Sequence, residues 1–288
     1  VSRLQAPSGA RKGKQMRTGI TVFCAALAVR LIYLFLFHDP SIAGSEDSPM
    51  YLMLAEKFKS AGLLEAAGDR TPGYPVFLAA LSYAGFSSTT AIVFIQAVID
   101  ALSCVITAMI YKNCFGRGAL LCGLLMALNL NMVILSGLIL PETLFLFVFI
   151  LSISFFVAAL KSANFMKLAA AMLLLALAAL IRPAAFYLYI IMPVLLLMAG
   201  LFMKKNPARL LFSILGVLLI SFPLLAFQMT QNYRHYGSTQ FVSQGGTHLL
   251  NWVVPGVYQY SGNGSYTKGL ERSKQALASQ MATDGLER

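Results

Sequence analysis

Charged residues are scarce in this chain. They make up 11% of its 288 residues, whereas 58% of the residues are hydrophobic. The mean hydropathy is +0.73, and several windows of about 20 residues, the length that crosses a bilayer, carry almost no charge. This composition is far from that of a soluble domain. It predicts an all-α, polytopic membrane helix bundle, because a backbone in lipid must satisfy its own hydrogen bonds.

Cysteine is also rare, with four residues in the chain. The spacing of these cysteines matches no zinc or redox motif, and all of them lie in or beside apolar segments. We interpret them as small apolar packing residues. They are Cys24, Cys104, Cys114 and Cys122.

Acidic residues number only 11, and six of them lie between the first two long apolar segments, within residues 39–88. Carboxylates are costly next to hydrocarbon, so a cluster of them at the mouth of a helix bundle indicates a function. The six are Asp39, Glu46, Asp47, Glu56, Glu65 and Asp69.

The apolar segments predict seven membrane spans. We place these spans at about 18–38, 89–111, 118–138, 141–160, 165–181, 184–203 and 209–229. The segments on one side of this arrangement are basic and contain no acid. Their basic residues are Arg3, Arg11, Lys12, Lys14, Arg17, Lys112, Arg117, Lys161, Lys167, Lys204, Lys205 and Arg209.

This charge distribution follows the positive-inside rule. It predicts a basic cytoplasmic tail at 1–17, a seven-span module at 18–229 and an outer segment at 230–288. The net charge of +11 is then a topology signal, and the basic residues are expected to contact anionic membrane lipids. Nucleic acid is not expected as a partner, because basic and aromatic residues do not interleave on a soluble face.

Two short helices are expected in the outer loop at 39–88. Residues 51–64 are amphipathic and predict a helix along the outer membrane surface. Residues 72–86 contain an apolar run that is too short to span and predict an interfacial or re-entrant helix.

Asp47 is the acid with the clearest candidate role. It lies four residues before Tyr51, where its carboxylate could act as a general base toward an acceptor hydroxyl or amine. Glu46 beside it could bind a metal or the acceptor. Two structural alternatives remain open: Asp47 or Ser48 could cap a helix, and Asp47 could pair with Arg70.

Polar residues that border the later spans add further candidates. Glu142 opens the fourth span, where an acid also complements the helix dipole. Arg182, between the fifth and sixth spans, could snorkel or bind a lipid phosphate through its guanidinium. Arg234 and His235, just past the seventh span, could join that phosphate site.

Two charges, Arg30 and Asp100, lie well inside the expected spans, away from the span ends. They could pair with each other between the first and second spans, and that pair could be purely structural.

Taken together, these segments resemble a known family. In order, they are Asp47-Ser48-Pro49-Met50-Tyr51-Leu52-Met53-Leu54-Ala55, Arg70-Thr71-Pro72-Gly73-Tyr74-Pro75, Pro141-Glu142-Thr143-Leu144-Phe145, Arg182-Pro183 and Asn232-Tyr233-Arg234-His235-Tyr236-Gly237. From about residue 17 to residue 250, the chain resembles the GT-C glycosyltransferases of the superfamily that contains dolichyl-phosphate-mannose protein mannosyltransferases and lipid A aminoarabinose transferases.

The resemblance implies an inverting transfer of one sugar from a polyprenyl-phosphate donor, with Asp47 as the general base. Growing charge on the leaving phosphate would be stabilised by positive side chains; the candidates are Arg70, Arg182, Arg234 and His235. Tyr51 and Tyr74 would belong to the substrate loop. Glu46 and Glu142 would bind the acceptor or a divalent metal, although the place of a second acid found in some relatives is taken by Ser48.

The acceptor expected from the resemblance is a lipid, a glycan or a protein, and the location is the outer side of a bacterial inner membrane. Members commonly continue with further spans and an outer domain, so we expect residues 230–288 to begin such a domain. Two other functions remain open: a transporter or flippase of lipid-linked sugars, and a non-catalytic assembly subunit with the same fold. A transporter typically has internal repeats with helices broken near the midplane, and the sequence shows no convincing repeat.

Overall fold

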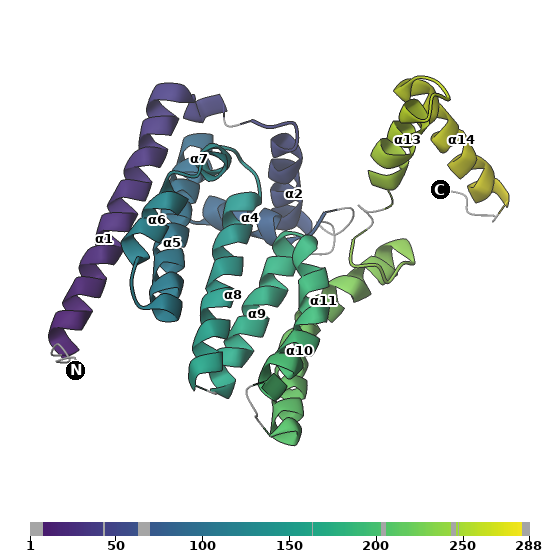
Figure 1. Cartoon of the computed structure of the whole chain (residues 1–288). Helices are drawn as coiled ribbons and strands as arrows, with labels where there is room; N and C mark the ends of the chain where they lie inside the picture. Colours follow the sequence, from purple (N-terminus) through teal and green to yellow (C-terminus); the bar gives the residue numbers. More distant parts are fainter. Residues whose placement is uncertain are drawn as a thin grey trace.

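The computed structural model describes residues 8–42, 44–62, 70–162, 164–202, 206–242, 246 and 248–283. Helices account for nearly all of these residues, and no β-strand occurs among them. Figure 1 shows a row of long helices, two short helices across one end of the row, and a separate helical hairpin near the C-terminus.

The long apolar segments form most of the bundle. In chain order, its helices are α1 (Ser8–Ile32), α5 (Thr89–Phe115), α6 (Ala119–Ala127), α7 (Leu130–Ser136), α8 (Glu142–Ser162), α9 (Phe165–Ile181), α10 (Ala184–Phe202) and α11 (Pro207–Tyr236).

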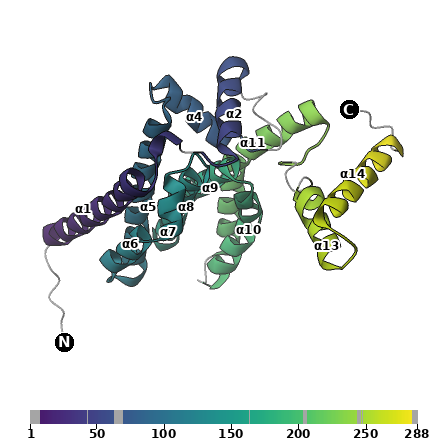
Figure 2. The ribbon, with the colours of Figure 1, turned by 90° about the horizontal axis from the view of Figure 1, so that it is seen from above.

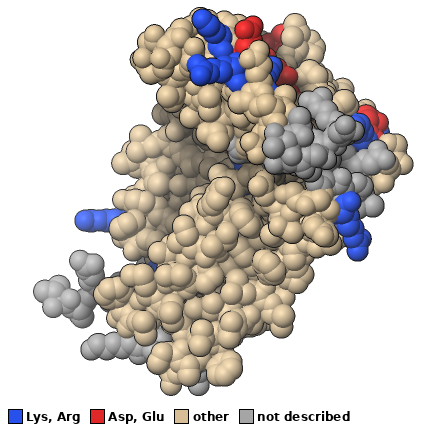
Figure 3. All heavy atoms as spheres, turned by 90° about the vertical axis from the view of Figure 1, so that its right-hand side faces the viewer, with Lys and Arg blue, Asp and Glu red and all other residues tan. Residues whose placement is uncertain are grey.

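The prediction of an all-α, polytopic membrane bundle is confirmed. Five segments of the described chain are long and apolar enough to span a membrane, and a sixth candidate is the bent pair α6–α7. The remaining predicted span corresponds to α9, an apolar helix of 17 residues. Figure 3 shows one face of the molecule, where charged side chains gather mainly toward the upper part and a broad area below carries few.

The bundle is built by neighbouring helices in a row. Helix α5 packs against α1 and α8, α8 packs against α9, and α9 contacts both α10 and α11. Figure 2, which looks onto the end of the bundle, shows the same order from α1 to α11. Small buried residues allow this close packing: α9 has five alanines that are buried, and they are Ala169, Ala171, Ala176, Ala178 and Ala179.

The two ends of the bundle differ in character. One end carries α2 (Ser48–Ala61) and α4 (Gly73–Tyr83), which pack against each other, and α4 also rests on α9. The other end carries the start of α1 and the turns that follow α5 and α8, where Lys161 Nζ donates a hydrogen bond to the carbonyl oxygen of Asn113. The basic turns after α5 and α8 therefore share an end with the start of α1. Which end faces the cytoplasm stays a prediction.

The third predicted span, at 118–138, is not one continuous helix. It is broken into α6 and α7, which are bent by 57° relative to each other. Asn129 begins the second piece by accepting a hydrogen bond from the backbone N–H of Met132 at 3.3 Å, as a helix N-cap does. The carbonyl oxygen of Ala127, left over where α6 ends, accepts a hydrogen bond from Arg30 Nη1 at 2.6 Å. Hydropathy cannot detect such a break, because the two pieces together are apolar enough to count as one span.

The intramembrane charges pair as expected. Arg30 Nε donates to Asp100 Oδ2 at 2.7 Å, and both side chains are almost completely buried. The pair ties α1 to α5, while the contact of Arg30 with Ala127 ties both helices to the break after α6. Arg30 and Asp100 therefore act as a structural junction of three segments.

Candidate functional site

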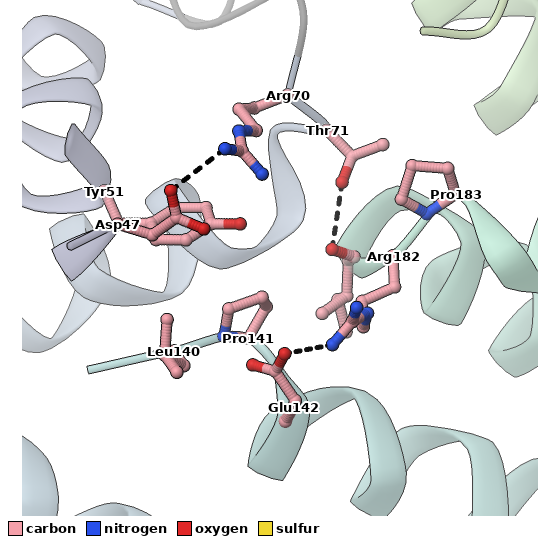
Figure 4. Close-up of a pocket in the computed structure, with 10 residues that line it drawn as sticks. Asp47, Tyr51, Arg70, Thr71, Leu140, Pro141, Glu142, Arg182 and Pro183 are labelled. Carbon is pink, nitrogen blue, oxygen red and sulfur yellow. Dashed lines mark hydrogen bonds and ion pairs between the residues drawn. The ribbon is translucent and has the colours of Figure 1, made fainter. Parts of the chain in front are cut away.

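A polar pocket of about 70 Å³ lies where the short helices α2 and α4 meet the ends of α8 and α9 (Figure 4). That volume can hold several water-sized groups. It therefore fits a polar head group such as a phosphate, while the rest of a large substrate would extend outside. The lining residues are Asp47, Tyr51, Arg70, Thr71, Leu140, Pro141, Glu142, Ile181, Arg182 and Pro183.

The first wall of the pocket is an ion pair between Asp47 and Arg70. The distance from Arg70 Nη2 to Asp47 Oδ1 is 3.0 Å, and the Asp47 side chain remains 48% exposed. Asp47 stands at the N-cap position of α2, but its side chain makes no capping hydrogen bond. Of the two structural alternatives for Asp47, pairing with Arg70 is thus observed and side-chain capping is not. The partly exposed carboxylate can still be reached by a ligand.

The second wall is an ion pair between Glu142 and Arg182. Glu142 is the first residue of α8, and Arg182 directly follows α9, where Pro183 separates it from α10. Arg182 Nη1 contacts Glu142 Oε1. Arg182 is therefore paired with an acid of the same chain. Figure 4 shows this pair on the side of the pocket away from Asp47.

Each pair has a polar atom without a hydrogen-bond partner among the described residues. These two atoms are Arg70 Nε and Glu142 Oε2, and both are buried. Buried polar atoms in native proteins are nearly always hydrogen-bonded, so the open donor and the open acceptor can each bind a water or a ligand group in this pocket.

Two hydrogen bonds to backbone carbonyls hold the walls in place. Ser48 Oγ, at the start of α2, donates to the carbonyl oxygen of Ile139 at 3.0 Å. Thr71 Oγ1 donates to the carbonyl oxygen of Ile181 at 2.9 Å. Ser48 is buried, so its role in this structure is to anchor the residues beside Asp47 to the segment that precedes Glu142. Thr71 likewise anchors the residue next to Arg70 to the end of α9.

The structure explains why residue 73, shortly after Arg70, is a glycine. A Cβ atom at this position would lie 2.6 Å from the carbonyl oxygen of Leu180. Glycine is therefore required because the start of α4 approaches the backbone of α9 so closely. This close approach fixes how far Arg70 and Thr71 lie from the end of α9.

Substitution Gly73→Ala is expected to destabilise the protein by about 1–3 kcal/mol, because the added methyl group meets backbone that cannot move independently. The measurement is thermal unfolding of the purified protein in detergent. Gly44→Ala is the matched control in the same loop, since its nearest atom would be 3.5 Å away. Equal melting temperatures for the two variants would contradict the close approach of α4 to α9.

The two tyrosines of the predicted substrate loop have different positions. Tyr51 lines the pocket, with the Arg70 guanidinium 5.8 Å from its ring centroid. Burial raises the pKa of Tyr51, so its hydroxyl stays protonated. Tyr74 is fully buried behind it in an edge-on contact at 5.2 Å and donates to Gln96 Oε1 at 2.6 Å. Tyr74 thus supports Tyr51 and is not among the residues that line the pocket.

Three other candidate residues are not among the pocket's lining residues. Glu46 is exposed beside Asp47, and Arg234 is exposed near the end of α11. The side chain of His235 lies outside the described part of the chain. In the described ranges, no group of three or more histidine, cysteine or acidic side chains could hold a metal ion. The roles assigned to Glu46, Arg234 and His235 remain predictions.

The comparison with protein families covers all of the pocket's lining residues except Asp47 and Tyr51. Residues 69–227, more than half of the chain, match the family model described as dolichyl-phosphate-mannose-protein mannosyltransferase. The chain belongs to this family. A search of curated proteins found no match.

Family membership makes the chain a membrane glycosyltransferase of the GT-C type. The matched region of this mannosyltransferase-family protein contains Arg70, Glu142 and Arg182, but it begins after Asp47. The position of Asp47 in the pocket is therefore an observation independent of the family match. Sequence reasoning missed the carbonyls of Ile139 and Ile181, because a backbone acceptor has no side-chain signature.

Proposed function

We propose that this protein transfers a sugar from a polyprenyl-phosphate carrier to an acceptor hydroxyl or amine on a lipid, a glycan or a protein, with inversion at the sugar. The observation that carries the proposal is the pocket between two arginine–carboxylate pairs, each with a buried polar atom left without a partner. The family match supports a transferase over a transporter or a non-catalytic subunit.

On the donor side, we assign the carrier phosphate to Arg182. A guanidinium can bind two phosphate oxygens at once. Arg182 lies at the end of α9, where a carrier lipid between the apolar helices would present its head group. The phosphate would exchange places with Glu142 and then receive the charge that develops as the sugar leaves. Arg70 Nε, which has no partner in the described structure, offers a second donor.

On the acceptor side, we assign the general base to Asp47. Its carboxylate would take the proton of the acceptor while the acceptor oxygen or nitrogen bonds to the anomeric carbon. The bond from that carbon to the phosphate oxygen breaks at the same time, and polyprenyl phosphate leaves with the electron pair. Asp47 and Arg182 lie on different sides of the pocket (Figure 4), which suits a displacement in which nucleophile and leaving group are opposed.

The location that we propose follows from the basic turns. The turns after α5 and α8 share one end of the bundle with the start of α1, and the pocket lies at the other end. By the positive-inside rule, the pocket would open on the outer side of a bacterial inner membrane. Membrane lipids would surround the bundle.

Arg182→Gln is expected to weaken the binding of polyprenyl phosphate by about 10- to 100-fold, because charge-assisted hydrogen bonds to the phosphate are lost. The measurement is equilibrium binding of polyprenyl phosphate to the purified protein in detergent. Lys57→Gln removes an exposed cation from α2, in the same outer loop, and is expected to bind as the parent does. Unchanged affinity of Arg182→Gln for polyprenyl phosphate would show that Arg182 does not bind the phosphate.

A further inference from the structure

The hairpin after α11 has one apolar face that nothing in the described structure covers. Its first arm is continuous, because the π-helical turn Leu249–Val253 (η3) runs directly into α13 (Val254–Tyr260). Apart from one adjacent pair, Trp252 and Val253, large apolar side chains recur there every three or four residues, which places them along one side of the arm. They are Leu249, Trp252, Val253, Val257 and Tyr260, and each is at least 52% exposed.

The opposite side of this arm is occupied by α14 (Tyr266–Thr283). A Cβ atom on Gly269 would lie 3.0 Å from Pro255 Cα, so the two helices cross in close contact. Ser273 Oγ donates to the carbonyl oxygen of Leu250 at 3.0 Å, and the hydroxyl of Tyr266 donates to the carbonyl oxygen of Asn251. The partner helix is therefore firmly attached, but it does not shield the apolar face.

We propose that this face lies in the membrane interface, in the leaflet at the pocket's end of the bundle. The arm follows α11, whose segment Leu210–Arg234 is one of the span candidates. Residues 237–248 connect the two and reach about 40 Å at most when extended. Figure 1 shows the hairpin beside that end of the bundle. The partner of the face is thus phospholipid.

The composition of the face suits this position. Tryptophan and tyrosine are enriched at the boundary between hydrocarbon and head groups, and Trp252 and Tyr260 are 67% and 93% exposed. An amphipathic helix of this kind lies in the plane of the interface with its apolar side buried by about 5–10 Å. The other helix, α14, presents exposed polar residues, among them Lys268, Glu271 and Gln275, and would face water.

Trp252 allows a direct test, because it is the only tryptophan in the chain. The full chain is reconstituted in phospholipid vesicles, and Trp252 fluorescence is measured with lipids that carry a spin label about 5–10 Å below the head groups and, separately, with acrylamide. We expect strong quenching by the spin-labelled lipids and weak quenching by acrylamide. Neither readout depends on sugar transfer.

The control moves the fluorophore to the water-facing helix, in the variant Trp252→Phe/Gln275→Trp. We expect the reverse result there, with strong quenching by acrylamide and weak quenching by the lipids. If acrylamide quenches the parent and the control equally, the face lies in water and the proposal is wrong. If Trp252 is protected from both quenchers, protein covers the face, for example a second copy of the chain, and the proposal is wrong as well.

Discussion

Replacement of Asp47 by asparagine is expected to lower the rate of sugar transfer by about 100- to 10,000-fold, the usual contribution of a positioned general base. The amide retains the size of the carboxylate and can still accept a hydrogen bond from Arg70, which in this structure lies 3.0 Å from Asp47 Oδ1. It cannot take a proton from the acceptor. The measurement is transfer from a polyprenyl-phosphate-linked sugar by the purified protein.

The expected loss is specific to catalysis. Binding of polyprenyl phosphate should be nearly unchanged in Asp47→Asn, because Arg182 and Arg70 remain. Glu56→Gln is the matched control, since Glu56 is an exposed acid on the same helix and pairs only with Lys59 in the described structure. Transfer at the full rate by Asp47→Asn would show that this carboxylate is not the base.

The second large effect concerns folding. Arg30→Met leaves Asp100 buried without its cation and is expected to lower the free energy of unfolding by about 3–5 kcal/mol. The carbonyl oxygen of Ala127 also loses its hydrogen bond at the break between α6 and α7. The free energy of unfolding can be measured in mixed micelles by titration with a denaturing detergent.

A double variant separates the cost of an unpaired charge from the cost of lost packing. Arg30→Met/Asp100→Leu removes both charges and is expected to regain most of the stability, because an apolar pair of similar volume often replaces a buried ion pair without loss. Asp100→Leu is measured alone as well. If the loss of unfolding free energy in the double variant equals the sum of the losses in Arg30→Met and Asp100→Leu, the two charges do not act as a pair.

Several features of the fold could be predicted from single residues and their spacing. Long apolar segments were sufficient to predict the bundle helices, and the scarcity of charge between them made Arg30 and Asp100 conspicuous as partners. The cluster of acids in residues 39–88 drew attention to Asp47, and the structure brings Asp47 together with Arg70, Glu142 and Arg182 in one pocket. The predictions of the bundle and of the Arg30–Asp100 pair succeeded because charge near hydrocarbon is costly and must be paired. The catalytic role of Asp47 stays a prediction.

Other features depend on contacts between segments that are distant in the chain. At the break after Ala127, Arg30 from α1 donates to the carbonyl oxygen of Ala127, and the buried Tyr74 donates to Gln96 from α5. Ser48 was considered as a helix cap or as a replacement for an acid, but it donates to the carbonyl oxygen of Ile139. Local sequence contains no information about which backbone carbonyl a side chain will meet.

The most direct test of the proposed function is the position of the phosphate in a structure of the protein bound to polyprenyl phosphate. We expect the phosphate within hydrogen-bond distance of Arg182, with Glu142 displaced from that arginine and the lipid tail between the apolar helices. Asp47 should remain across the pocket, open to the acceptor. A phosphate bound elsewhere, with the Asp47–Arg70 and Glu142–Arg182 pairs intact, would contradict the proposed function.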